Sequence, residues 1–230
     1  EKEAACEYDR AAKRLRGTGA VLNFHDSGHK VLPKRQNTRV ESEVESEVTV
    51  DSTGIEIPTL SLIQGKYHVN IADGDHAELL FYADGMKKAK GAFEKFTVDF
   101  DIAADYHTSS LNVTIESASI NTGNGMRDEH LTEEAFFNVT KFPTITFQST
   151  SIEDADTSYV AKGDLTLLSN TKPIDVPFKH LGNGTDSEGL AFEAFEGSFV
   201  FDRVEYGMEE ISGAGNIVTV TFYCELILSE

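Results

Sequence analysis

An alternation of apolar and polar side chains at every second residue runs through this chain from about residue 58, and it constrains the fold more than any other feature. Successive side chains of a β-strand point to opposite faces, so this period predicts strands with one buried face. Polar segments rich in Gly, Asp and Ser separate the alternating series. The pattern predicts an all-β, antiparallel barrel or sandwich of about eight or nine strands. The clearest alternating series span residues 96–102, 111–115, 145–147, 174–178, 195–201 and 218–228.

One interval departs from this alternation. Residues 121–131 read "NTGNGMRDEHL", and residues 128–138 then carry good helix formers, with Leu131 and Phe136 on one helical face. We therefore predict a turn followed by a short helix over residues 128–138 that caps one end of the β structure. Asp128 is expected to cap the N-terminus of this helix, and Arg127 either to pair with an acidic residue or to face a polar head group at a cavity entrance.

The aromatic residues of the strands bear on function. About eight strands closed into a barrel leave an interior that side chains just fill or that holds one small ligand. The sequence does not decide between a solid core and a long apolar cavity, although small residues such as Ser149 and Gly197 share the inward faces. The inward phenylalanines are Phe96, Phe100, Phe147, Phe178, Phe199 and Phe222.

The charge of the chain limits its partners. The net charge is −19, and the acidic excess lies after residue 40, because the first 40 residues are net basic. An acidic body repels phosphate backbones, so we expect no nucleic-acid partner. No apolar run approaches the roughly 20 residues that span a bilayer, so no transmembrane segment is expected. A homodimer is left open.

The two cysteines and the histidines give weak signals. Cys224 lies on the apolar face of the final strand, which favours a buried free thiol, although a bridge to Cys6 is also compatible with the sequence. The segment "EKEAAC" has no apolar leader, yet "AAC" is what a lipoprotein-type cleavage site would leave, so an acyl anchor on Cys6 is one hypothesis. His25 and His29 lack a third ligand, and a solvated loop is favoured over a metal site.

Residues 1–57 carry no regular pattern that defines a fold. A short helix near residues 4–16 and a hairpin near residues 41–57, where "ESEVESEV" repeats, are possible readings. We treat residues 1–57 as an N-terminal extension and residues 58–230 as the barrel domain.

Several motifs in order resemble the YceI-like family of lipid- and polyisoprenoid-binding proteins. The first is "SINTGNGMRDEHL", which is followed by "FF" at 136–137 and "FPTITFQS" at 142–149. "GDLTLLSNTKPIDVPF" at 163–178 looks like the family's strand–turn–strand unit, and "FDRVEYGM" at 201–208 is similar to its arginine-and-glycine segment. The likeness extends more loosely back to about Lys66, where "KYHVNIADGDHAEL" departs from the family pattern.

The resemblance implies an antiparallel, lipocalin-like β-barrel whose cavity takes an isoprenoid chain. It also implies a bacterial protein that is periplasmic or secreted. The expected ligand is a long-chain isoprenoid lipid, either a prenylated quinone such as ubiquinone or a polyprenyl phosphate, with no catalytic cofactor. Apolar burial would hold the tail, and polar residues at the mouth would select the head group. The residues expected to contact the ligand are Phe96, Phe100, Val113, Arg127, His130, Phe136, Phe147, Phe178, Phe199 and Phe222.

Two other functions are weighed against a lipid carrier. The first is a structural or interaction module with a filled barrel, which would act through its acidic surface or its N-terminal extension. The second is an enzyme that acts on the lipid head group through Asp128 and His130. The chain has no nucleophile elbow, P-loop or zinc signature, so we predict a protein that is not an enzyme.

Overall fold

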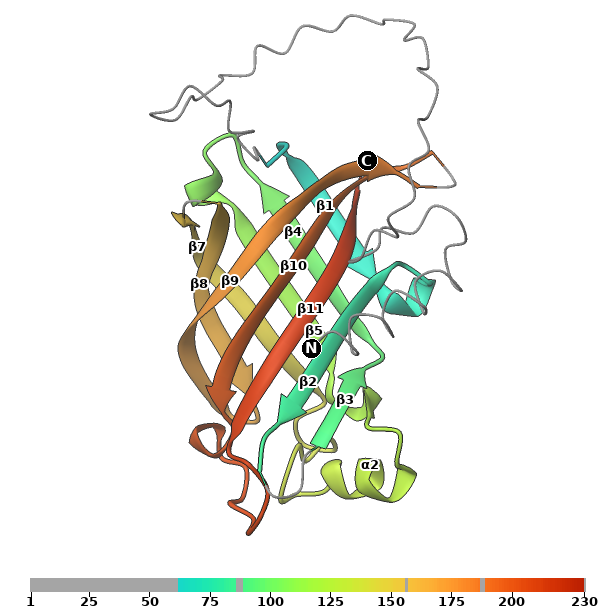
Figure 1. Ribbon diagram of the computed structural model, residues 1–230, viewed down its shortest axis with the longest axis vertical. Coiled ribbons are helices and arrows are strands. Elements are labelled where there is room, and N and C mark those ends of the chain that lie inside the picture. The colour runs from blue at the N-terminus through green and yellow to red at the C-terminus, as the bar shows by residue number, and fades with distance from the viewer. Residues whose placement is uncertain (1–61, 86–88, 156, 187–188, 230) are drawn as a thin grey trace, which may run out of the picture. The chain divides into compact units, whose positions relative to one another are not determined.

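A computed structural model describes residues 62–85, 89–155, 157–186 and 189–229 (Figure 1). The predictions for residues 1–57, including those for Cys6, His25 and His29, lie outside the described residues. Within them, eight antiparallel strands form a closed barrel, because each strand pairs with the next and β1 also pairs with β11. These strands are β1 (Gly65–Asn70), β4 (Phe96–Ile102), β5 (Ser110–Glu116), β7 (Thr144–Ala155), β8 (Ser158–Leu167), β9 (Asn170–Thr185), β10 (Ala191–Asp202) and β11 (Ile217–Leu228).

The burial of the strands follows their sequence period. In β4, Phe96, Val98, Phe100 and Ile102 are buried while the residues between them are not. β8 and β9 alternate in the same way over most of their length. The side chains that point inward form one continuous apolar core. The predicted all-β, lipocalin-like antiparallel barrel of about eight strands with a short helix is therefore confirmed.

Three further strands extend the sheet at one end of the barrel, the lower end in Figure 1. β2 (Ala77–Ala83) pairs with β11, β3 (Ala89–Phe93) pairs with β2, and β6 (Ile120–Asn121) pairs with β3. β11 therefore has two partners on one edge, because its last residues pair with β1 and its residues 218–224 pair with β2.

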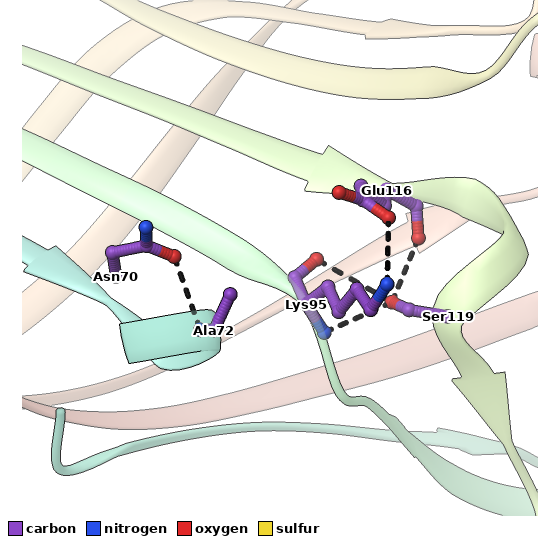
Figure 2. A network of polar contacts seen from close by, with 5 residues as sticks. All are labelled: Asn70, Ala72, Lys95, Glu116 and Ser119. Atoms are coloured by element: carbon purple, nitrogen blue, oxygen red, sulfur yellow. Dashed lines mark hydrogen bonds and ion pairs between the residues drawn. The ribbon is translucent and has the colours of Figure 1, made fainter. Parts of the chain in front are cut away.

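A small polar network fixes this extension to the barrel wall. Figure 2 shows that Lys95, in the turn between β3 and β4, meets the connection between β5 and β6. The Lys95 backbone N–H donates to Ser119 Oγ at 3.1 Å, and Ser119 Oγ donates to the carbonyl of Glu116 at 2.8 Å. The ion pair of Lys95 with Glu116, at 3.6 Å, is exposed and contributes little to stability. The two hydrogen bonds between the Ser119 hydroxyl and the backbone of Lys95 and Glu116, rather than the ion pair, hold the turn.

Within the described residues, four single 3₁₀ turns connect the strands. In the first of them the side chain of Asn70 accepts a hydrogen bond from the N–H of Ala72 at 3.0 Å and so begins the turn, as Figure 2 also shows. The four turns are η2 (Ile71–Asp73), η3 (Tyr106–Thr108), η4 (Ser117–Ser119) and η5 (Val204–Tyr206).

The helix begins and ends earlier than its sequence predicts. α2 spans Gly125–Leu131, and its N-cap is Asn124, whose side chain accepts from the N–H of Arg127. The expectation that Asp128 caps the helix is wrong, because Asp128 lies within the helix and binds Thr122 instead. The Thr132 hydroxyl donates to the carbonyl of Glu129 at 2.6 Å, which competes with continued helical bonding. Residues 132–141 then form turns that lead to β7.

Candidate functional site: an apolar cavity inside the barrel

The interior of the barrel holds a cavity of about 230 Å³. The inward-facing, apolar side chains of the barrel strands form its walls, and together they make one continuous lining. β2 and β3 add Leu79, Phe81 and Phe93 to the lining. The predicted ligand-contacting residues that line the cavity are Phe96, Phe100, Val113, Arg127, Phe136, Phe147, Phe178, Phe199 and Phe222.

A glycine makes room for one of these rings. Gly197 on β10 lies opposite Phe222 on β11, and a Cβ at Gly197 would lie 2.3 Å from the Phe222 ring. The absence of a side chain at Gly197 therefore lets this ring lie against the wall, as the pairing of large and small residues on the inward faces suggested. Ser149 has another role, because its hydroxyl accepts from the N–H of Leu111 at 2.7 Å next to a register shift in β7.

Three phenylalanines close the upper end of the cavity. Phe100, Phe178 and Phe195 come from β4, β9 and β10, and each ring contacts the other two, with centroids 5.7–6.1 Å apart. Edge-to-face and tilted pairs of this kind are favourable beyond their burial. All three rings line the cavity and are almost fully buried. We call these three residues the aromatic floor, because they form the closed end of the cavity.

The lower end of the cavity is bordered by α2, the turns after it, and the connection between β10 and β11. Apolar residues from these segments, such as Leu131, Phe137 and Met208, line this end. Only a few polar or charged side chains lie on the lining, among them Arg127 from α2 and Arg203 from the segment after β10. We call this end the mouth.

Arg203 serves the architecture of the mouth. Its guanidinium donates to the carbonyl of Gly215 at 2.9 Å, to the carbonyl of Glu209 at 2.6 Å and to the side-chain oxygen of Asn216 at 3.3 Å. Burial lowers the pKa of Arg203, although Asp202 and Glu210 oppose that shift. Because Nε, Nη1 and Nη2 each donate to the protein, Arg203 ties the β10–β11 connection together.

Arg127 is held more loosely and faces the cavity. Its Nε donates to Thr122 Oγ1 at 2.8 Å and its Nη2 to the carbonyl of Thr122 at 3.0 Å. The Thr122 hydroxyl in turn donates to the carboxylate of Asp128. The expected direct pairing of Arg127 with an acidic residue is not found among the described contacts. Thr122 instead bridges Arg127 and Asp128, and in the described part of the chain Arg127 Nη1 has no hydrogen-bond acceptor.

His130 does not join the cavity wall. Its side chain is 60% exposed, its ring packs edge-on against Phe136, and its Nε2 lies 3.8 Å from the carboxylate of Glu133. Within the described part of the chain, no hydrogen bond joins His130 to Asp128. The structure therefore brings nine of the ten predicted contact residues to the cavity and leaves His130 outside it.

Sequence reasoning missed a buried polar cluster above the aromatic floor. His180 Nε2 and the carboxylate of Glu193 lie 2.5 Å apart, and Glu193 also accepts a hydrogen bond from the hydroxyl of Tyr67. Burial raises the pKa of Glu193, while His180 and Tyr67 oppose that shift. Burial, together with Glu193, raises the pKa of Tyr67 to about 12. The signal was present in the sequence, since His180 continues the apolar phase of Val176 and Phe178.

Two further observations bear on chemistry. In the described ranges, no group of three or more His, Cys, Asp or Glu residues could hold a metal ion. Cys224 is a buried free thiol, as predicted, and burial raises its pKa to about 12. No helix in the described part of the chain is long and apolar enough to cross a membrane.

A closed eight-stranded antiparallel barrel with an apolar internal cavity defines a lipocalin-like barrel protein. The YceI-like domain model matches residues 70–226, more than half of the chain, so this protein belongs to the YceI-like family. A UPF0312 protein of Vibrio cholerae is 31% identical over 156 residues, which cover 66% of this chain and 82% of that protein. A UPF0312 protein of a Shewanella species is 33% identical over 141 residues, which cover 60% of this chain and 74% of the relative.

Solved structures share the fold at lower identity. BcnA of Burkholderia cenocepacia superposes with a TM-score of 0.61 at 22% identity, over 70% of this chain and 99% of BcnA. A polyisoprenoid binding domain from Saccharophagus degradans, implicated in plant cell wall breakdown, gives a TM-score of 0.54 at 12% identity, over 73% of this chain and all of that domain. At these identities the likeness shows the fold.

Proposed function

We propose that this protein is a non-catalytic carrier that encloses the tail of a long-chain isoprenoid lipid in its barrel. The observation that carries the proposal is the cavity, which is lined by phenylalanines and aliphatic side chains from the barrel strands. A filled barrel, the basis of the alternative interaction module, would leave no such space. The solved domain from Saccharophagus degradans, described as polyisoprenoid binding, supports the same ligand class.

The size of the cavity fits part of an isoprenoid tail. An engineered apolar cavity of about 150 Å³ binds benzene, and drug-sized ligands occupy roughly 300–1,000 Å³. The cavity of about 230 Å³ lies between these values. A long tail would therefore need some phenylalanine side chains to change rotamer, or would leave its last units at the mouth. Burial of each CH₂ contributes about 0.8 kcal/mol, so even a partly enclosed tail is held well.

Arg127 is the residue proposed to select the head group. It lines the cavity at the mouth, and among the described residues its Nη1 has no acceptor. A charge-assisted hydrogen bond contributes about 1.5–3 kcal/mol, so a phosphate or a quinone carbonyl at this place would gain affinity. The two head groups differ in charge, so the affinity for a polyprenyl phosphate would depend more strongly on Arg127 and on the salt concentration than the affinity for a quinone.

The first test is organic extraction of the purified protein followed by mass spectrometry, together with titration of ligand-free protein with a prenylated quinone and a polyprenyl phosphate. We expect an extractable isoprenoid and saturable binding. Protein that yields no isoprenoid and binds neither probe would overturn the proposal.

The second test assigns the head group. Arg127→Gln is compared with Lys162→Gln, which removes an exposed cation paired with Glu153 on the wall of the barrel. If a polyprenyl phosphate is the ligand, Arg127→Gln should weaken its binding by about tenfold or more and Lys162→Gln should not. Equal losses in both variants would remove Arg127 from the head-group site.

We also propose that the protein acts in the periplasm or after secretion. Cell fractionation of the native host, with mass spectrometry of Cys6 for an acyl group, tests this placement. Recovery in the cytoplasmic fraction would contradict it.

A further inference from the structure

The upper end of the cavity has two layers of different chemistry. The first is the aromatic floor, which lines the cavity. The second consists of Tyr67, His180 and Glu193, whose side chains point inward from β1, β9 and β10 but do not line the cavity. We call these three residues the polar layer.

Positions along β9 and β10 separate the two layers. His180 is the next inward residue after Phe178 on β9, in the direction away from the mouth, and Tyr67 lies opposite Phe100 on the neighbouring strand β4. The ring of His180 lies 5.2 Å from the ring of Phe195. Glu193 is the next inward residue of β10 beyond Phe195 and binds His180. His180 and Glu193 therefore lie one inward position farther from the mouth than Phe178 and Phe195, and the Tyr67 hydroxyl reaches Glu193 from β1.

The two layers resist an apolar chain in different ways. Phenylalanine rings can change rotamer, and an apolar tail that displaces them meets another apolar surface. The polar layer offers no such exchange, because its side chains are at most 4% exposed and are bonded to one another. A tail that passed between them would leave a buried carboxylate, an imidazole and a hydroxyl without partners, and an isoprenoid has no polar atom to replace the lost bonds.

Resting on the proposed function, we propose that the polar layer is a length stop that limits how much of an isoprenoid tail the barrel encloses. The tail enters and leaves by the mouth, and its far end halts at the aromatic floor, since the residues behind the floor cannot separate. Tyr67, His180 and Glu193 are then specificity-determining residues for tail length, although they need not touch the ligand.

The test measures dissociation constants for the prenyl monophosphates geranyl, farnesyl, geranylgeranyl and solanesyl. With wild-type protein we expect affinity to rise at least tenfold per added unit until the enclosed space is full, and then to stop rising. The opened variant combines Phe195→Ala with Tyr67→Phe, His180→Leu and Glu193→Leu, so that no buried polar partner is left behind. Across the probe series it should continue to gain affinity at lengths where the wild type has stopped gaining.

Phe195→Ala alone is the matched control, because it removes one ring of the floor and leaves the polar layer intact. We expect its limiting length to stay within one isoprene unit of the wild type. The proposal is overturned if the folded, opened variant stops gaining at the wild-type length, or if Phe195→Ala alone shifts the limit as far as the opened variant does.

A second measurement uses only wild-type protein and so does not depend on whether the opened variant folds. A farnesyl or geranylgeranyl probe with a diazirine at the tail end is photolysed in the complex, and the adducts are mapped by mass spectrometry. Adducts on the aromatic floor support the stop, and adducts on residues beyond the polar layer overturn it. Failure of the wild type to bind any prenyl probe would contradict the proposed function, which is a separate result.

Discussion

Separating His180 from Glu193 should destabilise the barrel more than removing both residues together. In His180→Leu, the Glu193 carboxylate stays buried and loses the imidazole that lies 2.5 Å away, keeping only the Tyr67 hydroxyl. Breaking a buried pair in this way typically costs about 3–5 kcal/mol, whereas replacing both partners by apolar residues is often close to neutral. For a chain of this size each kcal/mol lowers Tm by about 2–4 °C, so His180→Leu should lose about 6–20 °C.

The pH dependence of this loss follows from Glu193. Burial raises its pKa above the ordinary value of 4.5, and His180 opposes that shift. A raised carboxyl pKa contributes stability that is fully present below pH 4.5 and is lost as the pH rises through the folded-state pKa. Without His180 that pKa rises further. The destabilisation in His180→Leu should therefore be large near neutral pH and shrink as the pH falls toward 4.5.

Urea unfolding of the wild type, both single Leu variants and the double variant gives the coupling energy at each pH. The exposed pair Lys172 and Glu205, at 2.9 Å, is the matched control and should couple by no more than about 1 kcal/mol. If His180→Leu and Glu193→Leu add within about 0.5 kcal/mol, the two residues are not coupled and the reasoning fails.

Three further predictions concern the mouth and the core. Gly215→Ala should lower stability and speed ligand release, because its Cβ would lie 1.2 Å from the backbone oxygen of Asp84; thermal melts and ligand off-rates check this. Cys224 should react with iodoacetamide at neutral pH only when the barrel unfolds, since burial raises its pKa to about 12; mass spectrometry with and without urea would show it. Asn124→Ala should cost about 1 kcal/mol by removing the cap that accepts from the Arg127 N–H, whereas Asn124→Asp should keep most of the stability in urea unfolding.

The walls of the cavity could be predicted from the sequence because they depend on a local property. A strand that buries one face must alternate, so Phe96, Phe147 and Phe178 point inward whatever their partners are. The YceI-like motifs then placed Arg127 near the mouth. The inward phase of the strands and the family motifs together predicted ten residues in contact with the ligand. Nine of these ten line the cavity.

The helix shows where local reasoning failed. Helix formers at 128–138 favoured a later helix, but the choice of N-cap depends on which side chain is free to accept the first N–H groups. Thr122 engages Asp128 through its backbone N–H and its hydroxyl, which leaves Asn124 to cap. His130 then faces solvent on the short helix. A shift of one turn in the start of the helix decides which side chains reach the cavity, and helix propensity does not fix the first residue that closely.

The closed end of the cavity was out of reach for a different reason. The two-residue period predicts that Tyr67, His180 and Glu193 point inward from their strands. Their meeting depends on the register of β9 with β10 and on the closure of the barrel, because β1 lies far from both strands in the sequence. A polar residue in an apolar phase is usually a sign of an error in the strand assignment or of a buried partner. Here the Glu193 carboxylate accepts from the Tyr67 hydroxyl and pairs with His180 Nε2, while His180 Nδ1 has no partner among the described residues. Three isolated violations of the apolar pattern are therefore better read together, as one bonded layer across a barrel whose remaining interior is apolar.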